Sequence, residues 1–359
     1  MRRWIGTIAL VITIFPCLSS AGHAQGAPAN VDRTLDIYFI DVLGGAATLI
    51  VTPEKESVLI DSGWAGFEDR DPKRIVHVLK DVAKLDGLDH LVTTHWHADH
   101  YGGVAGLSKL VDIRNFWDRG LPEDNEPGLE FPDGPKVDNP LGIAYRKASA
   151  GKRHSVKAGD ALPLQSKVKG VVLTSGGKVI PDANLTNRGV NPACEDAPAD
   201  FPVDPSDNAR SLTIRFTLGK FGFLDCGDLT WNVEKQLVCP IDRIGTIDLF
   251  QVTHHGADNS NHPTLLKTIA PTVAITNNGP RKGGTVAAYK RLRATPSIQA
   301  IYQLHRNAAT SAEDNTDPAL IANADPTGGQ FIHVTVAPDG SSFSVQFGEN
   351  GKKREFQSK

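Results

Sequence analysis

Apolar residues along the chain fall into short continuous runs and into longer segments in which they recur every three or four positions. The short runs predict buried strands over 35–40, 46–51, 58–60, 89–94, 211–218, 221–224, 247–252, 273–276 and 298–302, with a final hairpin over 330–347. The longer segments predict helices over 72–85, 101–110, 263–269 and 285–293, and another that begins near Leu229. This alternation of strands and helices predicts an α/β fold in which helices cover sheets.

Two segments between these elements lack the apolar periodicity. Residues 118–142 are rich in proline and acidic residues, and residues 175–208 are again rich in proline, asparagine and aspartate. Such composition is typical of long surface loops. We therefore predict one domain over 35–350 that carries loop insertions around 118–208.

The first residues have the pattern of an export signal. Arg2 and Arg3 are followed by an apolar run over 5–18, and a stretch of small residues ends at Ala24. This pattern predicts a signal peptide over 1–24 that is removed, followed by a flexible leader over 25–34. A membrane anchor is the alternative, but the run is short for a span of roughly 20 residues, and no later segment is long and apolar enough. We expect an exported protein, either periplasmic or extracellular.

Removal of that segment changes the balance of charge. It takes away two arginines and no acid, which leaves 36 of the 38 basic residues beside 41 acidic ones, a net charge of −5. Such an acidic chain does not favour nucleic acid as the partner.

Three cysteines remain after that removal, and an exported protein can pair two of them. Cys226 lies in an apolar strand and is expected to be buried. We therefore expect a disulfide between Cys194 and Cys239.

The sharpest chemical feature is the sequence THWHADHYGG, where a predicted strand ends and a helix begins. A tight loop at this position can aim His95 and His97 at one point, and Asp99 and His100 at another a few ångströms away. Imidazole together with carboxylate suits zinc, and also iron or manganese. The two glycines that end the sequence let the backbone pack closely behind the loop.

Two later segments offer further ligands at the ends of apolar strands. In FLDCGDL, Asp228 can bridge two cations, while Asp225 is the weaker candidate because it lies inside the strand. A helix cap is the alternative role of Asp228. In VTHHG, we favour His255 as a metal ligand and His254 as a contact for substrate.

These sequences resemble the HxHxDH signature of the metallo-β-lactamase superfamily, and the wider pattern is similar to its ComEC-type competence-protein branch. The resemblance covers roughly residues 35–305 and includes LDIYFIDV, VLIDSG, NARSL, FLDCGDL and HHGADNS in the expected order. It implies a four-layer αββα sandwich with long loop insertions. It also implies two divalent metal ions at one edge of the sheets. Zinc is the favoured metal, and manganese and iron are the alternatives.

The resemblance also implies which side chains hold each ion. One site has His95, His97 and Asp228, and the other has Asp99, His100, Asp228 and His255. Asp61 in VLIDSG matches a family aspartate behind the metal loop, with a turn-forming role as the alternative.

Three features depart from the family pattern. Many members supply a third histidine to the first site, whereas only His154 lies in the corresponding interval here, within an exposed basic stretch. The VGQGDA element of the ComEC-type branch is VLGGAA at 42–47 and lacks its acid. The sequence contains no channel-forming membrane domain, so DNA uptake is not implied.

Polar residues also follow two of the later predicted strands. His305 can reach the rim of the site, although a surface role is favoured. Residues 277–282, with the sequence NNGPRK, can contribute an anion-binding rim.

Together these features predict metal-dependent hydrolysis through a metal-bound hydroxide, with Asp99 orienting it, Asp228 bridging the ions and His254 contacting substrate. The ComEC-type resemblance favours a phosphodiester, either a small molecule or a component of the cell envelope. A lactone or β-lactam carbonyl is the alternative substrate. A non-catalytic metal-containing binding protein is the alternative function, and the sequence does not indicate an oligomeric state.

Overall fold

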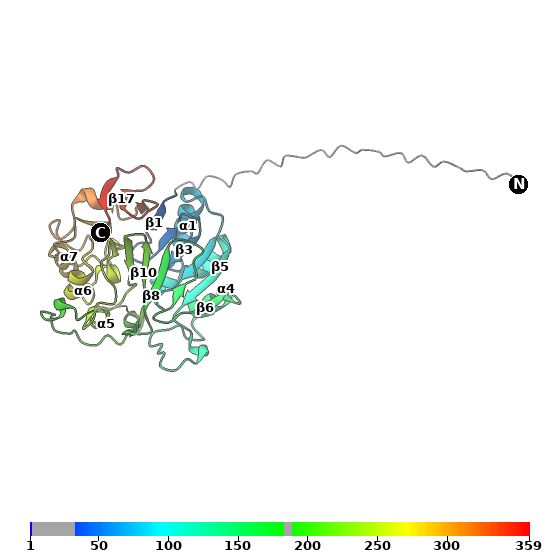
Figure 1. Ribbon diagram of the computed structural model, residues 1–359, viewed down its shortest axis with the longest axis horizontal. Helices are drawn as coiled ribbons and strands as arrows, with labels where there is room; N and C mark the ends of the chain where they lie inside the picture. Colours follow the sequence, from blue (N-terminus) through cyan, green and yellow to red (C-terminus); the bar gives the residue numbers. More distant parts are fainter. Residues whose placement is uncertain (2–32, 183–188) are drawn as a thin grey trace. The chain divides into compact units, whose positions relative to one another are not determined.

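The computed structural model describes Met1 and residues 33–182 and 189–359. The predicted signal peptide, apart from Met1, and nearly all of the predicted leader lie outside the described residues. Residues Arg33–Lys359 form one unit, which is built from two sheets with helices on their outer faces (Figure 1).

The first sheet comes from the beginning and the end of this unit. In spatial order it contains β18 (Arg354–Gln357), β17 (Ser342–Phe347), β16 (Ile332–Val336), β1 (Leu35–Phe39), β2 (Thr48–Val51), β3 (Ser57–Ile60), β4 (Leu88–Val92), β5 (Ile113–Asp118) and β6 (Arg153–Ser155). The strands from β3 to β6 run parallel to one another, and the other neighbours are antiparallel.

The second sheet comes from the middle of the chain. In spatial order it contains β15 (Ile321–Asn323), β14 (Ala300–His305), β13 (Val273–Thr276), β12 (Leu249–Gln251), β11 (Phe221–Asp225), β10 (Thr213–Leu218), β8 (Lys169–Ser175) and β7 (Ala161–Leu162), with β9 (Lys178–Val179) paired to β8. The strands from β11 to β15 run parallel.

Short helices connect the strands. The α-helices are α1 (Arg70–Val76), α2 (Ala98–Tyr101), α3 (Val104–Leu110), α4 (Pro140–Ser149), α5 (Trp231–Val238), α6 (Pro263–Ile269) and α7 (Val286–Arg293). A π-helical segment, His77–Val82, continues α1, so the predicted helix over 72–85 is present with an irregular second half. No helix within the described ranges is long and apolar enough to cross a membrane.

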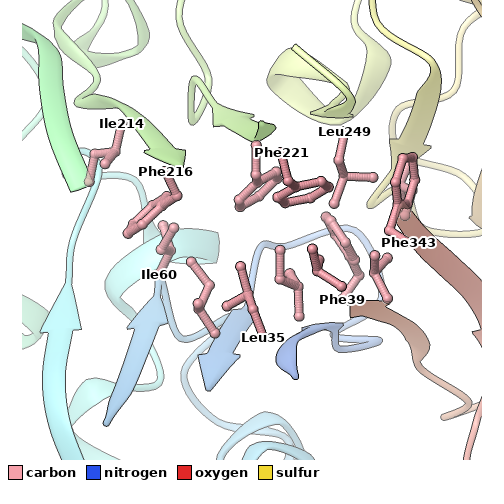
Figure 2. Packing of buried hydrophobic residues seen from close by; sticks show 14 of the residues in the cluster. Leu35, Phe39, Ile60, Ile214, Phe216, Phe221, Leu249 and Phe343 are labelled. Carbon is pink, nitrogen blue, oxygen red and sulfur yellow. The ribbon is translucent and has the colours of Figure 1, made fainter. Parts of the chain in front are cut away.

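Alternation of side chains along the strands builds the layer between the sheets. Leu35 and Phe39 of β1 point into this layer, whereas Tyr38 lies in the cluster on the opposite face of the sheet. Phe216 and Phe221 face them from the second sheet (Figure 2). Full burial of each such side chain stabilises the fold by roughly 1.5–3 kcal/mol.

Two further apolar clusters hold the helices against the outer faces of the sheets. Ile75 of α1, Leu107 of α3 and Tyr145 of α4 pack with residues of the first sheet. Leu237 of α5 and Leu292 of α7 pack with residues of the second sheet. The expected four-layer αββα sandwich is therefore confirmed.

The segment around 118–208 is not a simple insertion, and this part of the prediction is wrong. It contributes α4 to the helical layer, β6 to the first sheet and β8 to the second, where β8 pairs with β10. In β8, the short apolar run is flanked by Gly170 and by polar residues. The burial of this strand therefore depends on the strands that pair with it more than on its own sequence pattern. Most of the proline-rich stretches on either side are loops, as expected.

The predicted disulfide between Cys194 and Cys239 is present. It ties the loop that precedes residues 207–212 to the end of α5. Cys226 is buried, as expected.

Both sheets direct the carboxyl ends of parallel strands toward one edge of the sandwich. The loops after β4, β11, β12 and β13 meet there, and Leu212 N donates a hydrogen bond to Thr94 O across the two sheets at 2.8 Å. Such edges are where α/β proteins commonly place their functional side chains.

Candidate metal centre

The loop over residues 95–100 lies against the turn that follows β3. Ser62 N donates to His100 O at 2.6 Å, and Gly103 N donates to Gly63 O at 3.0 Å. A Cβ atom at Gly103 would lie 2.0 Å from Ser62 O, so only glycine fits there without a shift. The predicted close packing behind the loop is present.

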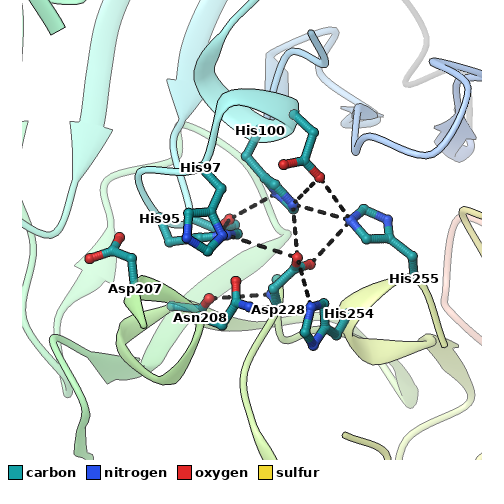
Figure 3. Close-up of polar contacts among 12 residues, drawn as sticks. His95, His97, His100, Asp207, Asn208, Asp228, His254 and His255 are labelled. Atoms are coloured by element: carbon teal, nitrogen blue, oxygen red, sulfur yellow. Dashed lines mark hydrogen bonds and ion pairs between the residues drawn. The ribbon is translucent and has the colours of Figure 1, made fainter. Parts of the chain in front are cut away.

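Four of the predicted ligands converge at this edge. Ligand atoms of Asp99, His100, Asp228 and His255 all lie within 4.8 Å of one another, and all four residues are buried. His100 Nε2 lies 3.2 Å from both Asp99 Oδ2 and Asp228 Oδ2. His255 Nε2 lies 3.2 Å from Asp99 Oδ2 and 3.4 Å from Asp228 Oδ1 (Figure 3). The loop after β4 and the loops after β11 and β12 therefore share one cluster.

Asp61 determines which nitrogen of His100 faces this cluster. Its Oδ2 lies 2.6 Å from His100 Nδ1. Because a carboxylate only accepts hydrogen bonds, Nδ1 carries a proton, and Nε2 is the nitrogen that faces the cluster. Thr94 Oγ1 donates to Asp61 at 2.7 Å and so accepts from His95 Nδ1 at 3.1 Å. The Nε2 lone pair of His95 is thereby left available as well.

His255 is turned toward the cluster by its backbone and by Asn277. The Thr253–Gly256 turn holds His254 and His255 at φ 56° and 53°, the left-handed region that costs a non-glycine residue energy. His255 Nδ1 donates to Asn277 O at 3.2 Å, so its Nε2 is also the nitrogen that faces the cluster.

His254 lies beside the cluster and keeps some exposure, 16% of its side chain. Ser260 Oγ donates to the backbone oxygen of Leu229, so it accepts from His254 Nδ1 at 3.2 Å. His254 Nε2 then accepts from Asn208 Nδ2 at 3.2 Å, and it lies 3.6 Å from Asp228 Oδ2. This nitrogen can accept a proton at the border of the cluster.

These donors fit divalent cations. The Nε2 atoms of His100 and His255 lie 3.2 Å apart, and the Nδ1 atom of each ring is bonded on the side away from the cluster, so both Nε2 atoms can bind a cation. His95 Nε2 is buried and has no hydrogen-bond partner among the described residues. Imidazole nitrogens with carboxylate oxygens form the donor sets of zinc, iron and manganese sites.

Electrostatics within the cluster favours ionised carboxylates. Burial alone raises the pKa of Asp228, but the charges of His100 and His255 outweigh it and hold that pKa well below its ordinary value. The pKa of Asp99 is likewise held low. Burial lowers the pKa of His95 well below its ordinary value, so His95 stays neutral and able to bind a metal.

The first of the two expected metal sites is less complete. His95 Nε2 lies 3.9 Å from Asp228 Oδ2, but His97 Nε2 lies 2.9 Å from Asp133 Oδ2. The side chain of His97 is 26% exposed, and the Asp133 carboxylate gives it a strong local partner. The structure therefore brings His95 to Asp228 but turns His97 toward a residue that the sequence did not single out.

Asp225 and Asp228 have different environments. Asp225 ends β11 outside the cluster, and its Oδ1 accepts from Gly227 N at 2.8 Å. Burial raises the pKa of Asp225 to about 7. Thr230, not Asp228, directly precedes α5, so the helix-cap alternative for Asp228 is not supported.

The match to known proteins agrees with this architecture. A family model described as Metallo-beta-lactamase superfamily matches residues 40–184. This part of the chain, residues 40–184, is similar to the metallo-β-lactamase superfamily. The atrochrysone carboxyl ACP thioesterase of Aspergillus terreus (strain NIH 2624 / FGSC A1156) is 41% identical over 68 residues, which are 19% of this chain. The match spans about a fifth of that relative, 20% of its length.

Solved structures with some similarity carry the same superfamily name or contain metals. The metallo-beta-lactamase fold protein YhfI from Bacillus subtilis is 11% identical, covers 75% of this chain and 95% of its own, and has a TM-score of 0.42. Zn(2+)-bound PqqB from Methylobacterium extorquens is 9% identical over 82% of this chain and 93% of its own, with a TM-score of 0.37. CmlA, a diiron beta-hydroxylase from Streptomyces venezuelae, is 13% identical over 68% and 44%, also with a TM-score of 0.37.

The other positions predicted from the sequence have different outcomes. His154 stacks on Trp117 at the end of the first sheet and is not part of the cluster. The favoured surface role of His305 is wrong, because His305 is buried and its Nε2 lies 2.8 Å from Asp41 Oδ1. Of residues 277–282, Lys282 reaches the centre and contacts the Asp99 carboxylate.

A buried ion pair behind the loop was not predicted. Asp207 accepts from Trp96 N at 2.7 Å within the ligand loop and also contacts the guanidinium of Arg119. Both side chains are fully buried. Asp207 directly precedes the NARSL element, which was the available signal in the sequence.

The Thr253–Gly256 turn is also held by hydrogen bonds to Asn261. Thr253 N donates to Asn261 Oδ1 at 3.0 Å, and Asn261 Nδ2 donates to Thr253 O at 3.1 Å. The next residue, His262, donates its backbone N–H to Glu234 Oε2 at 2.8 Å. Glu234 is buried, and burial raises its pKa to about 7.

The titration of Glu234 predicts a pH-dependent stability. Its ordinary pKa is 4.5, so the folded state holds the proton more tightly than the unfolded chain. The free energy of unfolding should therefore fall by up to about 3 kcal/mol as pH rises from 4.5 through about 7. Glu234→Gln should remove this part of the pH dependence, measured by urea unfolding at pH 5 and pH 8. If the free energy of unfolding depended on pH equally in the native protein and in Glu234→Gln, the assignment of this pH dependence to Glu234 would be contradicted.

Proposed function

We propose that this protein is an exported, metal-dependent hydrolase whose preferred substrates are phosphodiesters. The observation that carries the proposal is the buried convergence of Asp99, His100, Asp228 and His255 with the imidazole Nε2 atoms directed at one point. Two divalent cations bound by this cluster and by His95 would acidify water and polarise the scissile group.

The side chains of this site can perform the proton transfers of hydrolysis. The oxygen of water forms a bond to phosphorus while the bond to the leaving oxygen breaks. His254 Nε2, at the border of the cluster, accepts a proton released by water and returns it to the leaving oxygen. Asn208 and Ser260 hold that imidazole in place. Asp61 and Asn277 orient His100 and His255.

Two observations support phosphodiesters as the substrate class. The sequence elements NARSL, FLDCGDL and HHGADNS resemble those of the ComEC-type branch. The ammonium group of Lys282 lies at the Asp99 side of the centre, where it can attract an anionic substrate.

Hydrolysis of a carbonyl compound is the second candidate. It is favoured by the similarity to a fungal enzyme named as a thioesterase, although that match covers a small part of either chain. Export is supported by the Cys194–Cys239 disulfide, since such bonds persist in oxidising compartments.

An activity screen tests these proposals. The protein loaded with zinc or manganese should release nitrophenolate from bis-p-nitrophenyl phosphate and contain about two metal ions per chain. The same preparations should be assayed on nitrocefin and on a lactone. Turnover of only the carbonyl substrates would replace the proposed substrate class, and one metal ion or none without turnover would favour a binding protein.

A further inference from the structure

Lys282 occupies an unusual position beside the candidate centre. Its ammonium group contacts Asp99 Oδ2, the same oxygen that lies 3.2 Å from His100 Nε2 and His255 Nε2. The ammonium also lies 5.0 Å from the ring centroid of Trp64. The side chain of Lys282 remains 41% exposed, whereas that of Asp99 is 8% exposed. One cationic group therefore borders both the buried cluster and solvent.

Two glycine-containing turns fix the base of this lysine. Gly279 N donates to Lys282 O at 2.8 Å, which closes the turn after β13. A Cβ atom at Gly279 would lie 2.9 Å from Gly44 N, and one at Gly44 would lie 3.0 Å from the Cβ of Lys282. The two turns can approach this closely only because neither has a side chain at the contact. The backbone therefore fixes the position of the Lys282 Cβ atom without a bound ligand.

We propose that Lys282, packed over Trp64, selects substrates that carry a negatively charged oxygen next to the scissile bond. This inference rests on the proposed hydrolase function and names the group recognised there. A lysine ammonium has three donors. The contact with Asp99 occupies part of this set of donors. The solvent-exposed side of the ammonium group keeps donors for a phosphoryl or carboxylate oxygen. Trp64 restricts the ammonium to the cluster side through a cation–π contact.

A short chain of contacts joins Lys282 to His254. The ammonium contacts Asp99 Oδ2, which lies 3.2 Å from His100 Nε2. Asp228 Oδ2 lies 3.2 Å from the same nitrogen and 3.6 Å from His254 Nε2. A substrate oxygen bound by Lys282 would therefore lie near His254, the proposed proton acceptor. This places the recognised anionic group and the proton-transfer group at the same scissile bond.

The test compares Lys282→Met with the native protein on two substrates that share a nitrophenol leaving group. One is the anionic bis-p-nitrophenyl phosphate, and the other is a neutral p-nitrophenyl phosphotriester. We expect kcat/KM for the anionic diester to fall about 10- to 100-fold, as for loss of a hydrogen bond to a charged group. The value for the neutral triester should change less than about twofold, and Lys282→Arg should restore part of the loss.

A matched control and an independent measurement keep the outcomes separate. Lys290→Met removes a lysine of α7 whose side chain is 70% exposed, and it should leave both substrates unaffected. Metal content is measured for every variant, and inorganic phosphate should bind the metal-loaded Lys282→Met protein about 10-fold more weakly. Equal losses on both substrates, or unchanged phosphate binding, would overturn the role of Lys282. Absence of hydrolysis in the native protein with weaker phosphate binding in the variant would overturn the proposed function but support this inference.

Discussion

Replacement of Asp228 by asparagine is expected to remove most metal binding and to lower kcat/KM by more than the roughly 100-fold that loss of an outer partner of a metal site costs. Asp228 contacts His100 and His255 through different oxygens, at 3.2 and 3.4 Å. It also lies 3.9 Å from His95 Nε2. An amide at this position supplies only one oxygen and no charge, so it cannot serve both sides of the cluster. Metal content after dialysis and steady-state kinetics measure the effect.

Asp225→Asn is the matched control for that experiment. Asp225 is three residues away on the same segment and equally buried, but it lies outside the cluster. Because burial already raises its pKa to about 7, the neutral amide changes its charge little near neutral pH. Metal content and turnover should be retained. Full metal content in Asp228→Asn, or equal losses in both variants, would contradict a bridging role for Asp228.

Much of the fold could be predicted because apolar runs determine burial. Strands such as β1, β4 and β11 consist of residues that fill the layers on both faces, so their positions along the chain could be predicted from the sequence. β8 was missed because its burial comes from pairing with β10, which no local pattern shows.

The residues of the candidate site that directly follow strands could be predicted from the sequence. The carboxyl ends of parallel strands meet, so Asp228 and His255 could be expected near the loop after β4. The partner of a polar side chain could not be predicted in the same way. His97 faces Asp133 and His305 faces Asp41 because distant loops supply a carboxylate at hydrogen-bond distance.

The hydrogen bonds behind the loop explain why its histidines can act as ligands. Asp61 lies in the left-handed region at φ 59° and is 1% exposed, so its carboxylate is held beneath the loop. It accepts from Thr94 N at 2.8 Å and from Thr94 Oγ1, and it lies 2.6 Å from His100 Nδ1. One side chain thus connects the backbone of the loop with the tautomers of His95 and His100.

Asp61→Asn is therefore expected to weaken metal binding by about 10- to 100-fold. The amide has nearly the same size, but when its nitrogen faces His100 it donates to Nδ1 and places the proton on Nε2. That imidazole can no longer offer its Nε2 lone pair. A metal titration against a competing chelator measures the affinity directly, and catalytic activity at saturating metal should recover in part.

A buried aspartate with another histidine partner provides the control. Asp41 lies 2.8 Å from His305 Nε2 and also pairs with Arg74, outside the cluster. Asp41→Asn should destabilise the fold, because it weakens a buried ion pair, but it should leave metal affinity unchanged. Thermal unfolding of both variants separates the two effects. If Asp41→Asn lost metal as strongly as Asp61→Asn, general destabilisation would account for the result, and control of the histidine tautomers by Asp61 would have to be rejected.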